Sequence, residues 1–275
     1  MSSNQIRDDR VLRETRWLAA FIIPFLVAAT VILFVWPDDT GRLFAWPIKP
    51  PMTAMILGAA YTSGIYFFAR VVAARRWHTI QVGFLPVAAF AALLGIATIL
   101  HWDRFTHNHI SFIAWAGLYF AAPFLVLAVW LRNRWTDPRL LDQDDHAIPS
   151  TLRWMVGVTG AIEVAIGLLM FLQPNLMVAI WPWKLTLLTA RVIGALIVLP
   201  GLGDLGIAMD QRWSAARISL EAQAFSLLLI LISAARAWSD FNPSSLSTWF
   251  FIGGLSALLV GIIGLYTGME VKSRR

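Results

Sequence analysis

A chain of 275 residues that is 58% hydrophobic and only 14% charged is not built like a soluble domain, in which about 25% of residues are charged. The absence of cysteine excludes disulfides, thiolate metal sites, iron–sulfur clusters and cysteine nucleophiles. The sequence contains no P-loop, HExxH, G-x-S-x-G or dinucleotide-binding motif, so nothing in it favours phosphate, zinc-protease or hydrolase chemistry.

Apolar runs of about 20 residues recur along the chain, and each is long enough to cross about 30 Å of hydrocarbon as a helix. In chain order they occupy residues 17–36, 52–69, 79–100, 110–131, 154–172, 188–209, 215–235 and 248–269. A helix is required because hydrocarbon offers no partner to a free backbone N–H or C=O group. The sequence therefore predicts an all-α, polytopic membrane protein with eight transmembrane helices.

The basic residues predict the orientation of these spans. Sixteen of the 22 lie in the amino-terminal tail, beside the loops after spans two, four and six, and at the carboxyl terminus, whereas five lie on the other side. The positive-inside rule then places both termini in the cytoplasm. We interpret these residues as anchors at an anionic leaflet, so the net charge of +6 reflects topology and not nucleic-acid binding. The excess of arginine over lysine is typical of a GC-rich bacterium, and we expect the inner membrane.

The sequence contains an internal repeat. At an offset of 136 residues, "TAMILGA" from Thr53 aligns with "TARVIGA" from Thr189, and "HWDRF" from His101 aligns with "AWSDF" from Ala237. This predicts two parallel four-helix repeats at 17–131 and 154–269, joined by a cytoplasmic linker at 132–153 and flanked by cytoplasmic tails at 1–16 and 270–275. Four is an even number of crossings, so both halves have the same orientation. We expect each half to pack as a bundle of its own.

The second half carries the block "WPWKLTLLTARVIGA…QRW", which has a partner in the first half. This block resembles a group of multi-pass proteins of bacterial inner membranes. Each half also resembles a DoxX-type four-helix unit, in which a proline-containing turn precedes a span that opens with RxxG, here Arg191 to Gly194. The first half departs from this pattern because Met55 stands at the position of Arg191. The resemblance implies a fold and a location and brings no catalytic residues.

Three of the five histidines lie in the stretch "LHWDRFTHNHI" on the outer side, between spans three and four. His107 and His109 could bind Zn²⁺ or Cu²⁺, with His101 or Asp103 as a third ligand. We prefer the alternative of a solvated interfacial loop, because His-x-His in a short loop is common by chance and no partner that would orient these histidines can be read from the sequence. Beyond this metal, no cofactor is predicted.

Apart from Arg217 at the edge of span seven, four charged residues lie inside predicted spans, namely Glu163, Arg191, Asp204 and Glu221, and all belong to the second half. A charge in hydrocarbon costs at least a few kcal/mol and usually faces the interior of a bundle. The stretch "LPGLGDLG" interrupts span six beside them, which is typical of a transporter binding site. The alternative is structural pairing, for example of Glu221 with Arg217 one turn earlier.

The first half has a row of hydroxyl groups on Tyr61, Ser63 and Tyr66 of span two and Tyr119 of span four. They could line a cavity for a lipid-like molecule. We prefer the alternative that they hold helices together through hydrogen bonds.

Together these features predict a non-enzymatic carrier or binding protein for a small or lipid-like solute, or a partner subunit of a membrane complex. The ligand would lie between the charged second half and the hydroxyl-lined first half. The alternative is a membrane-embedded enzyme or redox subunit that uses the outer histidines. A further option is a homo-oligomer formed through the small-residue face of Gly264 and Gly268 in span eight.

Overall fold

The structure is a computed structural model that describes residues 7–141 and 145–273. Those residues form ten α-helices and no β-strand, and eight of the helices are long and apolar enough to cross a membrane. The predicted all-α, polytopic membrane fold is thereby confirmed. The eight long helices are α1 (Arg13–Thr30), α3 (Pro51–Ala73), α4 (Phe84–Leu100), α5 (Ile110–Asn133), α6 (Ser150–Leu172), α8 (Leu187–Met209), α9 (Trp213–Arg236) and α10 (Leu246–Ser273).

Short elements complete the chain between these spans. A π-helical turn (Val31–Val35) extends α1, and the short helices α2 (Thr40–Leu43) and α7 (Pro174–Ile180) follow α1 and α6. The third span begins later than predicted, at α4, because a 3-10 turn (Gln81–Gly83) precedes it. The eighth span is longer than predicted and ends at Ser273.

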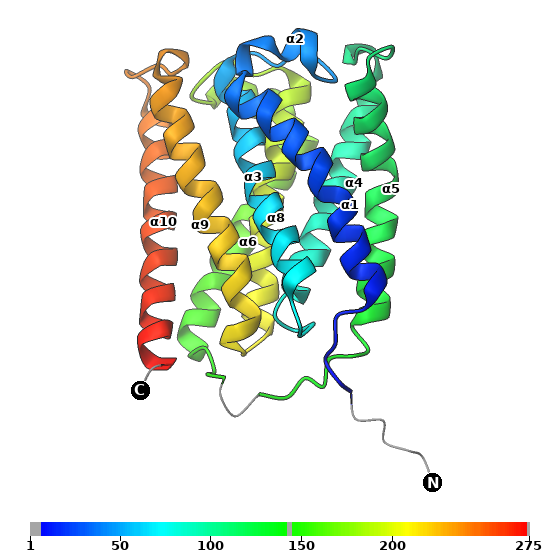
Figure 1. The fold of residues 1–275 in the computed structure, drawn as a ribbon. Helices are drawn as coiled ribbons and strands as arrows, with labels where there is room; N and C mark the ends of the chain where they lie inside the picture. Colours follow the sequence, from blue (N-terminus) through cyan, green and yellow to red (C-terminus); the bar gives the residue numbers. More distant parts are fainter. Residues whose placement is uncertain (1–6, 142–144, 274–275) are drawn as a thin grey trace.

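The beginning of α1 and the end of α10 lie at the same end of the molecule, as an even number of crossings requires (Figure 1). We call this the terminal end. The turns between α3 and α4 and between α8 and α9 also lie there, whereas α2 lies at the opposite, far end (Figure 1).

The eight spans associate as pairs that cross between the halves. Within the halves, α1 packs on α3, α4 on α5, α6 on α8 and α9 on α10. Between the halves, α3 packs on α9 and α4 packs on α8, and α3 and α8 are the two most buried spans. The expectation that each half packs as a separate bundle is therefore not met. The helices α3 and α8, and likewise α5 and α10, begin 136 residues apart (51 and 187, 110 and 246), while the duplication itself stays a prediction.

Glycine residues make the contact between α6 and α8 very close. Gly160 and Gly167 of α6 face Gly201 and Gly194 of α8. A Cβ atom added to Gly167 would lie 2.6 Å from the carbonyl oxygen of Gly194, closer than real Cβ atoms approach. Side chains at these positions would push the two helices apart, so the glycines are required by the backbone contact.

Candidate functional site: a groove beside Glu221

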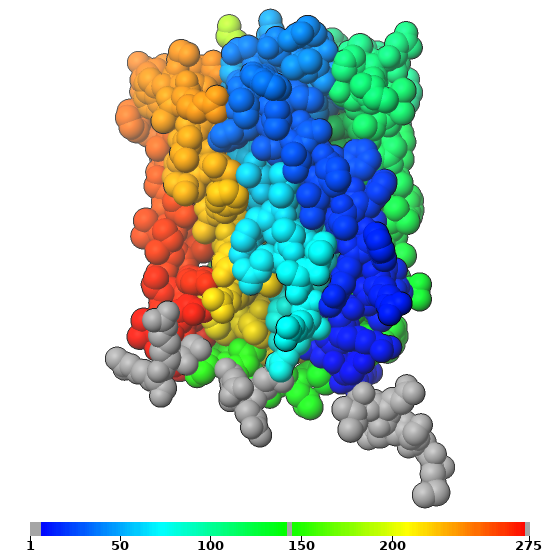
Figure 2. Space-filling model, in the orientation of Figure 1, coloured from blue at the N-terminus to red at the C-terminus, as the bar shows by residue number. Residues whose placement is uncertain are grey.

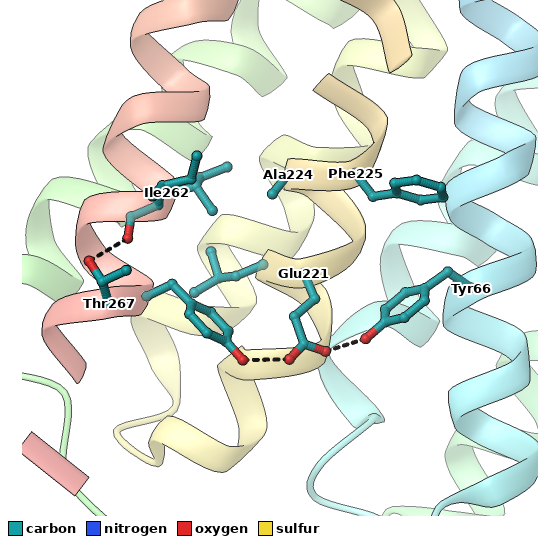
Figure 3. Close-up of a pocket in the computed structure, with 9 residues that line it drawn as sticks. Tyr66, Glu221, Ala224, Phe225, Ile262 and Thr267 are labelled. Carbon is teal, nitrogen blue, oxygen red and sulfur yellow. Dashed lines mark hydrogen bonds between the residues drawn. The ribbon is translucent and has the colours of Figure 1, made fainter. Parts of the chain in front are cut away.

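Glu221 of α9 lies at the centre of a cluster of hydrogen-bond donors. Its carboxylate accepts a hydrogen bond from the hydroxyl of Tyr66 on α3 and one of 2.7 Å from the hydroxyl of Tyr266 on α10 (Figure 3). Arg70 Nη1 lies 3.1 Å from Glu221 Oε2, and Arg217 Nε lies 3.3 Å from Oε1. One carboxylate therefore joins three helices. We call these five residues the Glu221 cluster.

Local helix geometry explains how the cluster forms. Tyr66 and Arg70 are four residues apart on α3, and Arg217 and Glu221 are four apart on α9, so each pair lies on one helix face. Arg70 Nη1 also donates to the Tyr66 hydroxyl at 2.7 Å, and Arg217 Nε donates to the Tyr266 hydroxyl at 3.0 Å. Each tyrosine is thus held by the arginine on its own side of the carboxylate.

A groove of about 480 Å³ runs between α9 and α10 from this cluster toward the middle of the spans. Its walls are almost entirely apolar. The lining residues are Tyr66, Leu220, Glu221, Ala224, Phe225, Ile262, Ile263, Tyr266 and Thr267.

The groove opens sideways, toward the surroundings of the spans. Phe225 and Ile263 are 38% and 50% exposed, and in Figure 3 Ala224 and Phe225 lie on the wall opposite Ile262 and Thr267. The space-filling view shows why it is open: α10 lies at the edge of the molecule and is bordered by α9 (Figure 2). In a bilayer, this opening faces lipid.

The structure does not bring the four predicted intramembrane charges into one chamber; it places them in three separate environments. Glu221 belongs to the cluster just described. Asp204 of α8 is buried and accepts a 2.9 Å hydrogen bond from Gln223, which lies two residues after Glu221 on another face of α9. Glu163 of α6 lies at the glycine contact with α8, near Asp204, and its Oε2 atom is buried without a hydrogen-bond partner. Arg191 is 13 residues from Asp204 on α8, about 20 Å along the helix.

Arg191 reaches the far end, where it contacts the first half. Its Nη1 atom donates to Nε2 of His101 at 2.7 Å. Because a guanidinium cannot accept a hydrogen bond, Nε2 of His101 must be the acceptor. Burial and the nearby charge of Arg191 lower the pKa of His101 below its usual value. This imidazole is therefore neutral near pH 7 and is occupied by a protein partner.

The other proposed metal ligands have separate roles. Nδ1 of His109 accepts a 3.2 Å hydrogen bond from the N–H of Ser111 and caps the start of α5. The ring of His107 packs against the ring of Trp102 at 4.9 Å between centroids, and Asp103 pairs with the neighbouring Arg104. Within residues 7–141 and 145–273, no three His, Asp or Glu side chains come together as metal ligands.

The predicted hydroxyl row divides between two roles. The hydroxyls of Tyr61 and Tyr119 are buried and lie 2.6 Å apart, where they join α3 to α5, and Ser63 donates to the carbonyl of Ala60 in its own helix. Only Tyr66 reaches the groove. Tyr61 and Tyr119 therefore hold two helices together through a hydrogen bond, which is the alternative that we preferred from the sequence.

A second polar cluster, at the terminal end, was not predicted from the sequence. The carboxylate of Asp9 accepts hydrogen bonds from the backbone and ring N–H groups of His78, and Asp145 accepts one of 3.1 Å from the backbone N–H of Ser214. His78 Nε2 and Ser214 Oγ lie 2.9 Å apart. Both Asp9 with Asp145 and His78 with Ser214 are 136 residues apart, which is the signal that the alignment of the halves could have supplied.

The linker adds a buried ion pair beside these four residues. The guanidinium of Arg212 makes two hydrogen bonds to Asp137, of 2.8 and 2.9 Å, and also bonds to Asp210. Burial alone would raise the pKa of Asp137, but the hydrogen bonds from Arg212 and from the backbone of Arg139 lower it below its usual value. Burial opposes the charge of Arg212 as well, yet its two carboxylate partners raise its pKa. Asp9, His78, Ser214, Asp145, Asp137 and Arg212 together form what we call the terminal latch.

No family model, curated protein or solved structure matches this chain. Function must therefore be inferred from the geometry of the molecule. The terminal latch is filled by its own side chains, whereas the groove at the Glu221 cluster has unfilled volume and an open side. The groove is accordingly the candidate functional site.

Proposed function

We propose that this protein is a non-enzymatic binding protein or carrier for an amphipathic, lipid-like molecule, and that the groove between α9 and α10 holds it. The observation that carries the proposal is a cavity with apolar walls and a single polar end, open at the side of a membrane-spanning bundle. An apolar pocket with a few convergent polar groups is the usual form of a small-molecule site.

The depth of the groove supports this assignment. Arg217 lies four residues after the first residue of α9, about 6 Å into the helix, so the Glu221 cluster lies near the boundary of the membrane. Phe225 lies about 6 Å deeper than Glu221. A polar head at the cluster and an apolar chain along Phe225 and Ile262 would match the polarity of the surrounding bilayer at each depth.

The proposal includes the setting of the protein. We place it in the inner membrane of a bacterium with both termini in the cytoplasm, since sixteen of the 22 basic residues belong to one side. The terminal end, and with it the polar end of the groove, would then face the cytoplasm. The ligand would enter from the cytoplasmic leaflet through the open side.

Photocrosslinking of lipids to the groove, with and without a side chain that fills it, tests the proposal. The protein is reconstituted in nanodiscs with phospholipids that carry a photoactivatable diazirine in the acyl chain, and crosslinked peptides are mapped. We expect crosslinks on α9 and α10 around Phe225 and Ile262. Ala224→Trp fills the groove, so these crosslinks should fall about ten-fold, which corresponds to about 1.4 kcal/mol.

The matched control is Ala257→Trp, which adds the same side chain to the exposed outer face of α10. It should leave the groove crosslinks unchanged. Equal crosslinking of the groove peptides in wild type and Ala224→Trp would contradict the proposal.

A further inference from the structure

The hydrogen bonds of the Glu221 cluster limit the kind of head group that the groove can accept. The Glu221 carboxylate already accepts from two tyrosine hydroxyls and two guanidinium groups. Two carboxylate oxygens offer about four lone-pair sites, so little acceptor capacity remains. A head group that needs an acceptor, such as an amine, therefore finds little at this end of the groove.

Donor capacity, in contrast, remains on both arginines. Both hydrogen bonds of Arg70 to this cluster come from Nη1, and those of Arg217 come from Nε. A guanidinium carries five N–H donors, so Nη2 of each residue can still donate. The side chains are 41% and 45% exposed, which leaves these donors open to an incoming group.

The two guanidinium groups approach Glu221 from different helices, Arg70 from α3 and Arg217 from α9, at the polar end of the groove. Guanidinium donors match the oxygens of a phosphate in charge and in fork geometry. Basic residues between membrane helices at the cytoplasmic side are suited to anionic lipid head groups. Glu270 weakens anion binding at Arg217, because its carboxylate lies 3.4 Å from the Arg217 guanidinium and partly neutralises the positive charge. Arg70 should therefore contribute more than Arg217.

We infer that the groove selects amphipaths with an anionic, phosphate-type head group, held by Arg70 and Arg217 while the acyl chain lies between α9 and α10. This inference rests on the proposed function and names the ligand class of the same site. Depth agrees with it, since Arg70 lies three residues from the end of α3, about 5 Å inside the helix, where phosphates of the leaflet are found.

The test uses two diazirine phospholipids with identical acyl chains, one phosphatidylglycerol and one phosphatidylcholine, added separately to the protein in phosphatidylcholine nanodiscs. We expect at least about five-fold more groove crosslinking by the anionic lipid. Arg70→Gln should remove most of this preference and Arg217→Gln a smaller part, whereas Arg70→Lys, which keeps the charge, should retain part of it. Arg132→Gln is the control, because it removes the same charge from an exposed residue at the end of α5.

The outcomes separate the inference from the proposed function. Equal groove crosslinking by both lipids, still blocked by Ala224→Trp, would overturn the anionic preference and leave the proposed function standing. A preference lost equally in Arg132→Gln would also overturn it, since bulk charge and not the site would then attract the lipid. Absence of groove crosslinks with either lipid would instead contradict the proposed function. Finally, soluble glycerol phosphate at millimolar concentration should not compete; full competition would reassign the site to free phosphate.

Variants that fail to fold cannot imitate these results, because each is compared with itself across the two lipids. A folded variant retains the monodisperse elution of the wild type and a single cooperative melting transition. Arg70→Lys provides the second check, since it keeps the positive charge beside Glu221 and removes the guanidinium fork.

Discussion

Helices α5 and α10 begin 136 residues apart and occupy the same position in the two halves of the sequence, but they are packed very differently. Seven residues of α5 are buried, whereas the described part of α10 buries only Thr248 and Met269. Asn133, at the end of α5, bonds to the backbone of Arg10 and Leu12 and is fully buried. Its counterpart in α10 is Met269, which cannot make such bonds.

The neighbours of the two helices explain the difference. α1 packs on α3 and also contacts α5, so the first half is closed around the Tyr61 and Tyr119 hydroxyls. α6 is instead drawn against α8 by glycines on both helices. α10 is left with α9 as its main neighbour, and the space between them is the groove. A groove therefore opens where α6 is committed to α8 and leaves α10 without a second large neighbour.

Substitution of a glycine in the contact between α6 and α8 should have the largest effect on stability. In the α6–α8 contact, Gly167→Leu would force a Cβ atom to 2.6 Å from a carbonyl oxygen of α8. We expect a loss of about 3 kcal/mol, the upper part of the range for overpacking, since the obstacle is backbone and cannot rotate away. Thermal unfolding in detergent measures it.

Gly261→Leu is the matched control for that substitution, because no atom lies within 4 Å of a Cβ placed at Gly261 of α10. Its melting temperature should equal that of the wild type in the monomer. A similar loss for both variants would contradict the difference in packing between α6 and α10. The Gly264 and Gly268 face of α10 is open in the same way, and its use in a homo-oligomer stays a prediction.

The ion pair between Asp137 and Arg212 in the terminal latch should make a smaller contribution to stability, and this contribution should depend on pH. Asp137 lies just after α5 and bonds to Arg212 at the start of α9, while burial leaves both side chains no more than 5% exposed. Because the pKa of Asp137 is lowered in the folded protein, its contribution to stability is present above its usual value of 3.8 and is lost as the pH falls below it. Asp137→Asn should cost about 2 kcal/mol at pH 7, less than removal of a whole partner from a buried pair.

The measurement for the latch is the difference in melting temperature between wild type and Asp137→Asn, recorded from pH 7 down to pH 3. This difference should shrink as the pH falls below about 4, because Asp137 of the wild type then loses its charge. A constant difference over the whole range would refute the role of the charged carboxylate. Asp103→Asn, at an exposed ion pair of the far end, is the control and should change little at any pH.

Much of the fold could be predicted from the sequence, since runs of about 20 apolar residues specify spans without reference to their neighbours. The pairing of Glu221 with Arg217 was also predictable, because a spacing of four residues places two side chains on one helix face. Depth in the membrane also follows from position in a helix: Asp204 lies five residues before the end of α8 and Glu221 eight residues after the start of α9, so both lie toward the terminal end.

What could not be predicted is the face that each side chain presents to other helices. Asp204 and Glu221 have similar depths, yet Asp204 bonds to Gln223 while Glu221 faces Tyr66 and Tyr266. That choice depends on the rotation of α9 and on which helices surround it, which no local pattern specifies. For the same reason, His101 was grouped with nearby histidines, although its partner, Arg191, lies 90 residues away.

The most direct measurement of the central claim, that the groove is open and takes up an amphipath, uses the absence of cysteine in this chain. Ala224→Cys places one thiol in the groove, and Ala190→Cys places one at a fully buried position of α8 as the control. We expect a membrane-permeant maleimide to label the thiol at residue 224 in detergent and to leave the one at residue 190 unlabelled. Labelling at residue 224 should become slower once phosphatidylglycerol is added. No labelling at residue 224, or labelling at a rate that lipid does not change, would contradict it.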